Sequence, residues 1–156
     1  MKIGVLVCVL IMAGFVSGAV VEDGAFEQAR EIPNANQPSF FRFTTSFGNY
    51  TIGNNGVGEL GFNGKRRLFF LNTKIQLVGR LRHIYFREYE KDLLLLYQVS
   101  DGKVYLARMN QESKQIRWRT PATMPCEVEG DVARCDETSI DLKTGKLKNA
   151  KQTAAS

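Results

Sequence analysis

Three carboxylates at alternate positions, Glu88, Glu90 and Asp92, are the residues whose spacing comes closest to acid–base chemistry. Alternate residues of a β-strand share one face, and two carboxylates on one face could act as the pair of a glycoside hydrolase. The same spacing also places charge along an exposed edge strand, where it prevents edge-to-edge pairing. The edge interpretation is favoured, and a hydrolase built on these three residues is kept as the alternative.

Other catalytic patterns are missing from the sequence. His83 is the single histidine, and no serine or cysteine nucleophile motif accompanies it. No Gly-Lys-Ser phosphate loop occurs, and the glycines of residues 53–64 are spaced for turns. We therefore predict no catalytic residue, no cofactor and no metal, and we treat enzymatic activity as the minority hypothesis.

The cysteines indicate one disulfide. Cys8 lies inside the N-terminal apolar run, which leaves Cys126 and Cys135 as an even pair in an exported chain. A zinc site would need further nitrogen or sulfur ligands, and the sequence offers only the distant His83. A disulfide between Cys126 and Cys135 is therefore the prediction.

The first residues have the pattern of a cleaved secretory signal. Lys2 precedes an apolar run over residues 3–16, and small residues follow at Ser17, Gly18 and Ala19. A membrane anchor needs about 20 apolar residues with charged flanks, so it is the less favoured interpretation. Cleavage after Ala19 or Gly18 predicts a periplasmic or extracellular protein without a transmembrane segment.

The mature chain is basic, and its charge is uneven. Residues 39–156 carry a formal charge of +7, and residues 65–87 contain no acidic residue. A basic domain outside the cell favours an anionic glycan, a lipid head group or an acidic protein as partner, although charge also serves solubility alone. No specific nucleic-acid motif is present. The candidate binding residues are Lys65, Arg66, Arg67, Arg80, Arg82, His83 and Arg87.

Step by step along the chain, the pattern is all-β. Residues 20–38 are acidic, contain Pro33 and Pro38, and are interpreted as a linker or arm. Residues 39–148 alternate with period two between glycine and asparagine turns and predict one domain of about 8–10 antiparallel strands with little helix. A partial propeller, a barrel and a sandwich all fit this pattern. A bulge near Arg82 and His83 would give the segment 80–89 a consistent inner face, and residues 149–156 are expected to be a disordered tail.

The clearest part of the domain is residues 92–120. The run Leu93–Leu96 predicts a strand covered on both faces, and two polar turns separate it from two further strands. In the third strand, Ile116 and Trp118 are expected to point one way and Arg117 and Arg119 the other.

A weak repeat accompanies this pattern. Residues 60–65, 106–114 and 140–147 each place an apolar strand before a polar turn that contains lysine. The segment 93–147 resembles PQQ-type β-propeller repeats, in which a strand of the form VYALD meets a Thr-Gly-Lys turn and a strand with tryptophan. Val104–Ala107, Trp118 and Thr144–Lys146 carry the resemblance. It implies blade-like meanders, but the chain is too short for a complete propeller, and no quinone cofactor is carried over.

Two non-enzymatic functions therefore compete. The first is an exported binding module that uses its basic face. The second is a structural component that pairs with itself or another chain through an edge strand. An inhibitor of secreted hydrolases is a third option, but lysozyme-type targets are basic and would repel this domain.

Overall fold

The computed structural model describes residues 24–71 and 80–148, and these residues form strands and turns without a helix. They make three antiparallel sheets of five strands each. The all-β prediction is confirmed, with more and shorter strands than the 8–10 expected. Each sheet is open, so the described residues do not form the barrel that the sequence pattern also allowed. The predicted signal peptide at 1–19 and the predicted tail at 149–156 lie outside the described residues.

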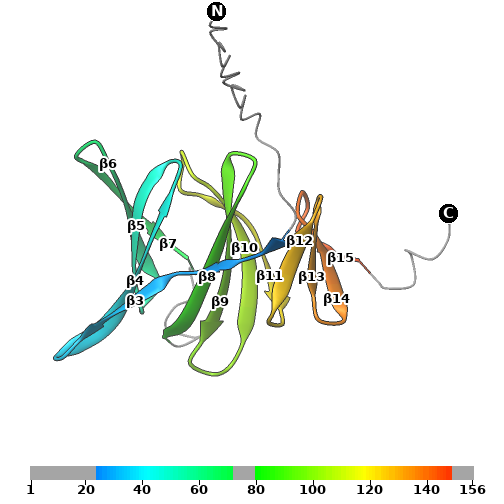
Figure 1. Ribbon diagram of the computed structural model, residues 1–156, viewed down its shortest axis with the longest axis horizontal. Helices are drawn as coiled ribbons and strands as arrows, with labels where there is room; N and C mark the ends of the chain where they lie inside the picture. Colours follow the sequence, from blue (N-terminus) through cyan, green and yellow to red (C-terminus); the bar gives the residue numbers. More distant parts are fainter. Residues whose placement is uncertain (1–23, 72–79, 149–156) are drawn as a thin grey trace, which may run out of the picture.

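Each sheet contains four strands that follow one another in sequence (Figure 1). The first sheet contains β4 Gln37–Thr45, β5 Gly48–Gly53, β6 Val57–Phe62 and β7 Lys65–Phe70. The central sheet contains β8 Leu81–Tyr89, β9 Asp92–Val99, β10 Val104–Asn110 and β11 Ile116–Ala122. The last sheet contains β12 Cys126–Glu129, β13 Val132–Cys135, β14 Thr138–Asp141 and β15 Leu147–Lys148.

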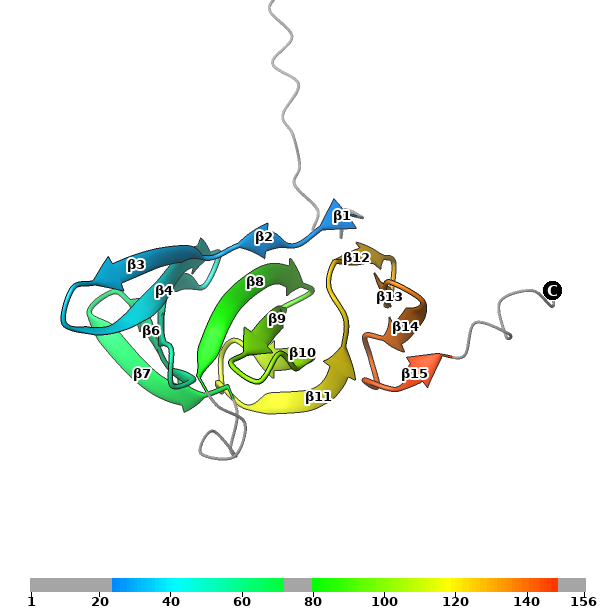
Figure 2. The same ribbon diagram turned by 90° about the horizontal axis from the view of Figure 1, so that it is seen from below.

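The fifth strand of every sheet comes from the N-terminal segment 24–34, which crosses all three sheets in turn (Figure 2). β1 Gly24–Ala25 pairs with β12, β2 Glu27–Gln28 with β8, and β3 Arg30–Asn34 with β4. Between the last two, the Ala29 N–H donates to Ile84 O at 2.9 Å, and the Ala29 side chain is buried. This segment is therefore paired along its length, which differs from the expected linker.

The core lies on both faces of the central strand β9. Leu93, Leu95 and Tyr97 belong to the cluster shared with the first sheet. Leu94 and Leu96 belong to a second cluster, shared with the last sheet. Successive residues of a strand point to opposite faces, so the run Leu93–Leu96 buries side chains on both sides, as predicted. Burying each leucine contributes roughly 1.5–3 kcal/mol, which makes β9 the centre of the fold.

Two irregularities decide which side chains face the core. The register of β8 against β9 shifts between Leu81 and His83, as the expected bulge requires. A second shift in β10–β11 pairs Met109 with Ile116 but Arg108 with Trp118. Because Arg117 is the extra residue, Ile116 packs on the first-sheet side and Trp118 on the last-sheet side. The expectation that Ile116 and Trp118 share one face was therefore wrong.

The three weakly similar segments fall at the same place in each meander, the hairpin between its third and fourth strands. These hairpins are β6–β7, β10–β11 and β14–β15. The likeness in sequence therefore reflects a shared position in three similar units. The structure leaves the resemblance to PQQ-type repeats as a prediction.

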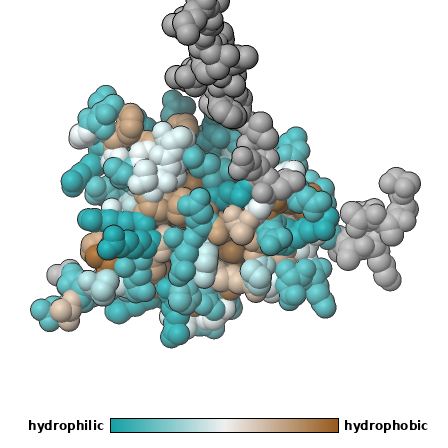
Figure 3. Space-filling model, in the orientation of Figure 1, coloured by the Kyte–Doolittle hydropathy of each residue, from teal (hydrophilic) through white to brown (hydrophobic). Residues whose placement is uncertain are grey.

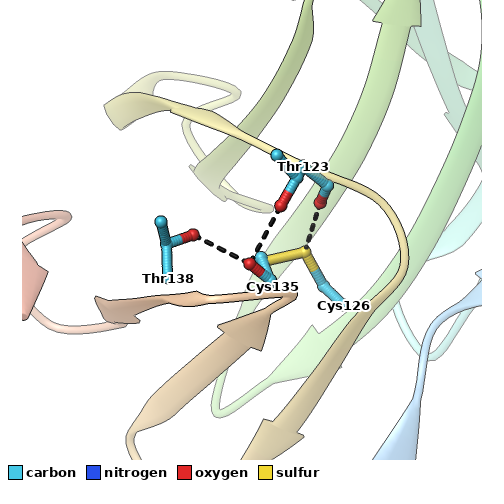
Figure 4. Close-up of a disulfide and its surroundings, with 4 residues drawn as sticks. All are labelled: Thr123, Cys126, Cys135 and Thr138. Carbon is cyan, nitrogen blue, oxygen red and sulfur yellow. Dashed lines mark hydrogen bonds between the residues drawn. A yellow bond between two sulfur atoms is a disulfide. The ribbon is translucent and has the colours of Figure 1, made fainter. Parts of the chain in front are cut away.

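The predicted disulfide is present. Cys126 and Cys135 lie directly opposite each other in the β12–β13 pair, with a sulfur–sulfur distance of 2.04 Å. The Thr123 and Thr138 hydroxyls both donate to Cys135 O, at 2.9 and 2.8 Å (Figure 4). The disulfide therefore links β12 to β13 in the last sheet, close to the end of β11.

In the described part of the chain, no helix is long and apolar enough to cross a membrane.

Candidate anion-binding groove

An open groove covers the outer face of the first sheet. The inner face of that sheet packs on the central sheet through Phe41, Phe43, Tyr50 and Ile52. The residues between them along each strand therefore face the other way, and they line a groove of about 870 Å³. Five strands, β3 to β7, contribute to its walls.

Four cations line this groove, and one carboxylate offsets them. They are Arg30, Arg42, Lys65 and Arg66, and the carboxylate is Glu59. Arg66 Nε lies 3.1 Å from Glu59 Oε1, but the Arg66 side chain is largely exposed. An exposed pair of this kind is worth about 0–1 kcal/mol, so it does not hold Arg66 firmly. The groove therefore has an excess of positive charge.

Arg30 and Arg42 occupy directly opposed positions in the β3–β4 ladder. Like charges at opposed positions destabilise a pair of strands, and both side chains are exposed. The Arg42 guanidinium lies 5.0 Å from the centre of the Phe40 ring, a cation–π distance that leaves its hydrogen-bond donors available for a ligand. An anion between the two guanidinium groups would remove the repulsion.

Apolar side chains stand next to these cations. Phe62 is 56% exposed at the end of the groove, and Leu68 and Phe70 are 71% and 57% exposed on β7. Leu68 and Phe70 share the parity of Arg66 in β7, so they extend the outer face beyond the groove. Hydrophobic and hydrophilic residues also lie side by side over the first sheet in Figure 3, at the left of the view.

The structure divides the predicted basic set. Lys65 and Arg66 line the groove, whereas Arg67 points to the other side of β7 and donates from Nη1 to Glu112 O at 2.8 Å. The other predicted residues, Arg80, Arg82, His83 and Arg87, belong to the central sheet or directly precede it. They therefore lie apart from the groove.

Arg80 and Arg87 take part in local contacts instead. The Arg80 backbone N–H donates to Ser100 Oγ at 3.1 Å, and Arg87 Nη1 donates to Ala25 O at 3.1 Å. Arg87 thus helps to hold β1 against the sheets. Arg82 and His83 are exposed at the bulge of β8.

Sequence reasoning missed Arg30 and Arg42. Arg30 was placed in a linker, because β3 is paired through its backbone and carries no alternating apolar pattern. Arg42 did have a signal, since it stands between Phe41 and Phe43 in a segment with period two. Alternation alone places it on the face opposite those two rings.

The carboxylates Glu88, Glu90 and Asp92 do not share a strand face, so that expectation was wrong. β8 ends at Tyr89 and β9 begins at Asp92, and Glu90 lies in the turn with a φ of 55°. Glu88 accepts hydrogen bonds from Ser46 and Gln111, toward the first sheet. Asp92 is bound by Arg108, whose Nη1 donates to Leu142 O in the last sheet. The two carboxylates thus serve different interfaces between sheets.

Tyr50 connects the groove to the interior. Its hydroxyl donates to Gln111 Oε1 at 2.9 Å, and burial, with a smaller contribution from the Glu88 charge, raises the pKa of this phenol. Tyr50 is therefore a neutral donor that fixes the wall of the groove.

Among the described residues, no group of three histidine, cysteine, aspartate or glutamate side chains is placed to hold a metal ion.

Comparisons with known proteins add no family to this picture. No protein-family model, curated protein or solved structure matches the chain.

Proposed function

We propose that this chain is an exported, non-enzymatic binding module that holds an anionic glycan in the groove of the first sheet. The observation that carries the proposal is the directly opposed pair Arg30 and Arg42 on an open, cation-rich face. The proposal keeps Lys65 and Arg66 from the predicted basic face of residues 65–87 and adds Arg30 and Arg42 on the outer side of the first sheet.

The chemistry of the groove suits an acidic sugar chain. Arginine binds carboxylate and sulfate groups with two parallel N–H donors, and Arg30 and Arg42 present two such groups side by side. The exposed Phe62 ring gives a sugar an apolar surface to lie on. The lining residues of the groove come from all five strands of the sheet, and a site of this extent fits a polysaccharide chain better than a compact ligand.

Export is part of the proposal. The predicted signal peptide and the Cys126–Cys135 disulfide both fit an oxidising compartment, where anionic glycans occur on cell surfaces and in envelopes. The resemblance to PQQ-type repeats is kept as a proposal too. Three four-stranded meanders with a similar hairpin in the same position support it.

Heparin affinity chromatography of two double variants tests the glycan proposal. Arg30→Gln with Arg42→Gln removes two charges from the groove, and Arg80→Gln with Arg82→Gln removes two charges elsewhere. We expect the groove variant to elute at clearly lower salt and the other variant to elute close to wild type. Elution of both variants at the same salt as wild type would contradict the proposal.

A second candidate function is assembly through β7. This strand is one of the two edge strands of the first sheet in the described residues, and it exposes Leu68 and Phe70. Edge strands with exposed apolar residues favour pairing with another chain. Size-exclusion chromatography at about 1 M salt distinguishes the two, because glycan binding weakens with salt. A larger species that persists there and is lost in Leu68→Ser would favour assembly.

A further inference from the structure

A second, smaller pocket lies where the β6–β7 hairpin meets the turn between β10 and β11. Its volume is about 190 Å³, and the cations Lys65, Arg67 and Lys114 line it together with the carboxylate of Glu112. Phe47 and Leu60 supply apolar walls. Arg67 reaches this pocket from the face of β7 opposite Arg66, and Lys65, at the start of the strand, lines both the pocket and the groove.

Lys114 is the unusual member of this cluster. Its side chain is buried, with the residue only 8% exposed. Its side chain lines the pocket together with Arg67 and Glu112. Removing an ammonium group even partly from water is costly unless an anion lies close to it. Burial lowers the pKa of Lys114, the nearby charge of Arg67 lowers it further, and Glu112 offsets only part of this.

The turn that carries Lys114 is fixed rather than adaptable. The Lys114 N–H donates to Asn110 O at 2.9 Å, and Asn110 Oδ1 accepts from Ser113 N at 2.7 Å. The neighbouring Gln111 is fully buried and accepts hydrogen bonds from Tyr50 and Thr45 of the first sheet. The backbone of this turn is therefore held at the junction between the sheets, which places the Lys114 side chain at the pocket.

Arg67 is fixed in the same place. Its Nη1 donates to Glu112 O at 2.8 Å, which uses one of the five N–H donors of the guanidinium group. Two cations are thus held close together, with a third, Lys65, at the rim, against one carboxylate. An anion placed among these cations would reduce the repulsion between them.

We propose that this pocket binds one sulfate or phosphate group, with Lys114, Arg67 and Lys65 as its cationic contacts. The volume suits a single tetrahedral oxyanion with a few waters, since a water occupies about 30 Å³ in the liquid. Such an anion presents oxygens in several directions, which matches cations from two separate elements. A sugar ring with its neighbours would not fit.

The pocket adjoins the groove, because Phe62 and Lys65 line both. We therefore infer that a sulfate or phosphate substituent of the glycan enters the pocket while the chain lies in the groove. This second step rests on the proposed function, whereas binding of a free oxyanion does not.

Amide NMR titration of the full mature chain with inorganic sulfate, inorganic phosphate and acetate, at constant ionic strength, tests the pocket. We expect saturable shifts of the Glu112 and Ser113 amides with a Kd of about 1 mM for sulfate or phosphate, and much weaker binding of acetate. Lys114→Met should weaken sulfate binding at least about tenfold. Lys103→Met, which removes an exposed lysine elsewhere, should leave it unchanged. If Lys114→Met does not fold, Lys65→Met should weaken binding by several-fold.

The proposal is overturned if wild type shows no saturable shift at these amides, or if the folded Lys114→Met or Lys65→Met variant binds sulfate as wild type does. A sulfated oligosaccharide separates this result from the groove. Weaker oligosaccharide binding in both Lys114→Met and the Arg30→Gln, Arg42→Gln variant supports the joined site. Sulfate binding without any oligosaccharide binding upholds the pocket and contradicts the proposed function.

Discussion

Asp92 and Arg108 form a buried ion pair at the start of the central hairpin, with Arg108 Nε 2.6 Å from Asp92 Oδ2. Asp92 is only 2% exposed, and it also accepts hydrogen bonds from Arg117 and from Asn110. Arg108 in turn donates to Leu142 O at 3.0 Å. This pair therefore joins the central sheet to the last sheet through a carboxylate whose hydrogen-bonding capacity is largely used.

Asp92→Asn should destabilise the protein by about 3–5 kcal/mol, because Arg108 would keep a buried charge with only the half-exposed Glu90, 3.0 Å away, as its ion-pair partner. Urea unfolding measures the loss. Arg117→Gln removes the half-exposed partner of the same carboxylate and should cost about 1 kcal/mol or less. A similar loss in the two variants would contradict the assignment of Arg108 as the partner that matters.

Gly58 should not tolerate a methyl group. A Cβ atom at this position would lie 2.2 Å from the Phe69 ring, and that ring is buried in the core of the first sheet. Gly58→Ala should therefore destabilise by roughly 1–3 kcal/mol through overpacking. Gly61→Ala, in the same strand, would meet its nearest atom only at 3.9 Å and should change the unfolding free energy little. Equal effects in thermal unfolding would show that Phe69 does not pack on Gly58.

The Cys126–Cys135 disulfide should contribute about 2–3 kcal/mol, since it closes a short loop in the unfolded chain. The variant Cys126→Ser with Cys135→Ser should lose this amount in urea unfolding. Wild type in reducing buffer should approach the variant, and the variant itself should not respond to reductant. If reductant also lowered the unfolding free energy of the variant, the loss seen in wild type would not come from this disulfide.

Alkaline pH should weaken the fold through Tyr97. Burial, which outweighs the opposing effect of Arg119, raises the pKa of Tyr97 from 10.0 to about 12. The unfolded chain releases this proton first, so the stability that Tyr97 contributes is complete below about pH 10 and is lost as pH rises toward its folded pKa. Urea unfolding between about pH 9 and about pH 11 measures this loss. The unfolding free energy of Tyr97→Phe should fall less steeply with pH than that of wild type. Parallel curves would contradict a buried neutral Tyr97.

The parts of the fold that the sequence predicted are those with local patterns. The apolar run of β9, the Gly turns and the cysteine pair each carry their signal within a few residues. The pairing of the segment 24–34 was not predictable in this way, because β1 to β3 bind through backbone groups that any sequence provides. The bulge at Arg117 was missed because Ile116 and Trp118 fit a regular strand equally well.

In the candidate site, too, residues with a local sequence signal were predicted and residues brought together by the fold were missed. Lys65 and Arg66 were predicted from their density of charge, and they line the groove. Arg30 and Lys114 come from distant parts of the chain. Only the folded sheets bring Arg30 into the groove and Lys114 into the pocket beside β7. Charge along the sequence indicated a basic face but could not separate residues that alternate between the two sides of one strand.

The most direct measurement of the central claim is amide chemical-shift mapping of the full mature chain with a sulfated oligosaccharide. The groove predicts that the largest shifts fall on the strands that line it, around Arg30, Arg42 and Gly61. It also predicts that raising the salt reduces the affinity, and that the groove variant lowers the slope of this salt dependence by roughly one unit for each arginine replaced. Shifts centred on Arg82 and His83, with the groove amides unchanged, would contradict the account.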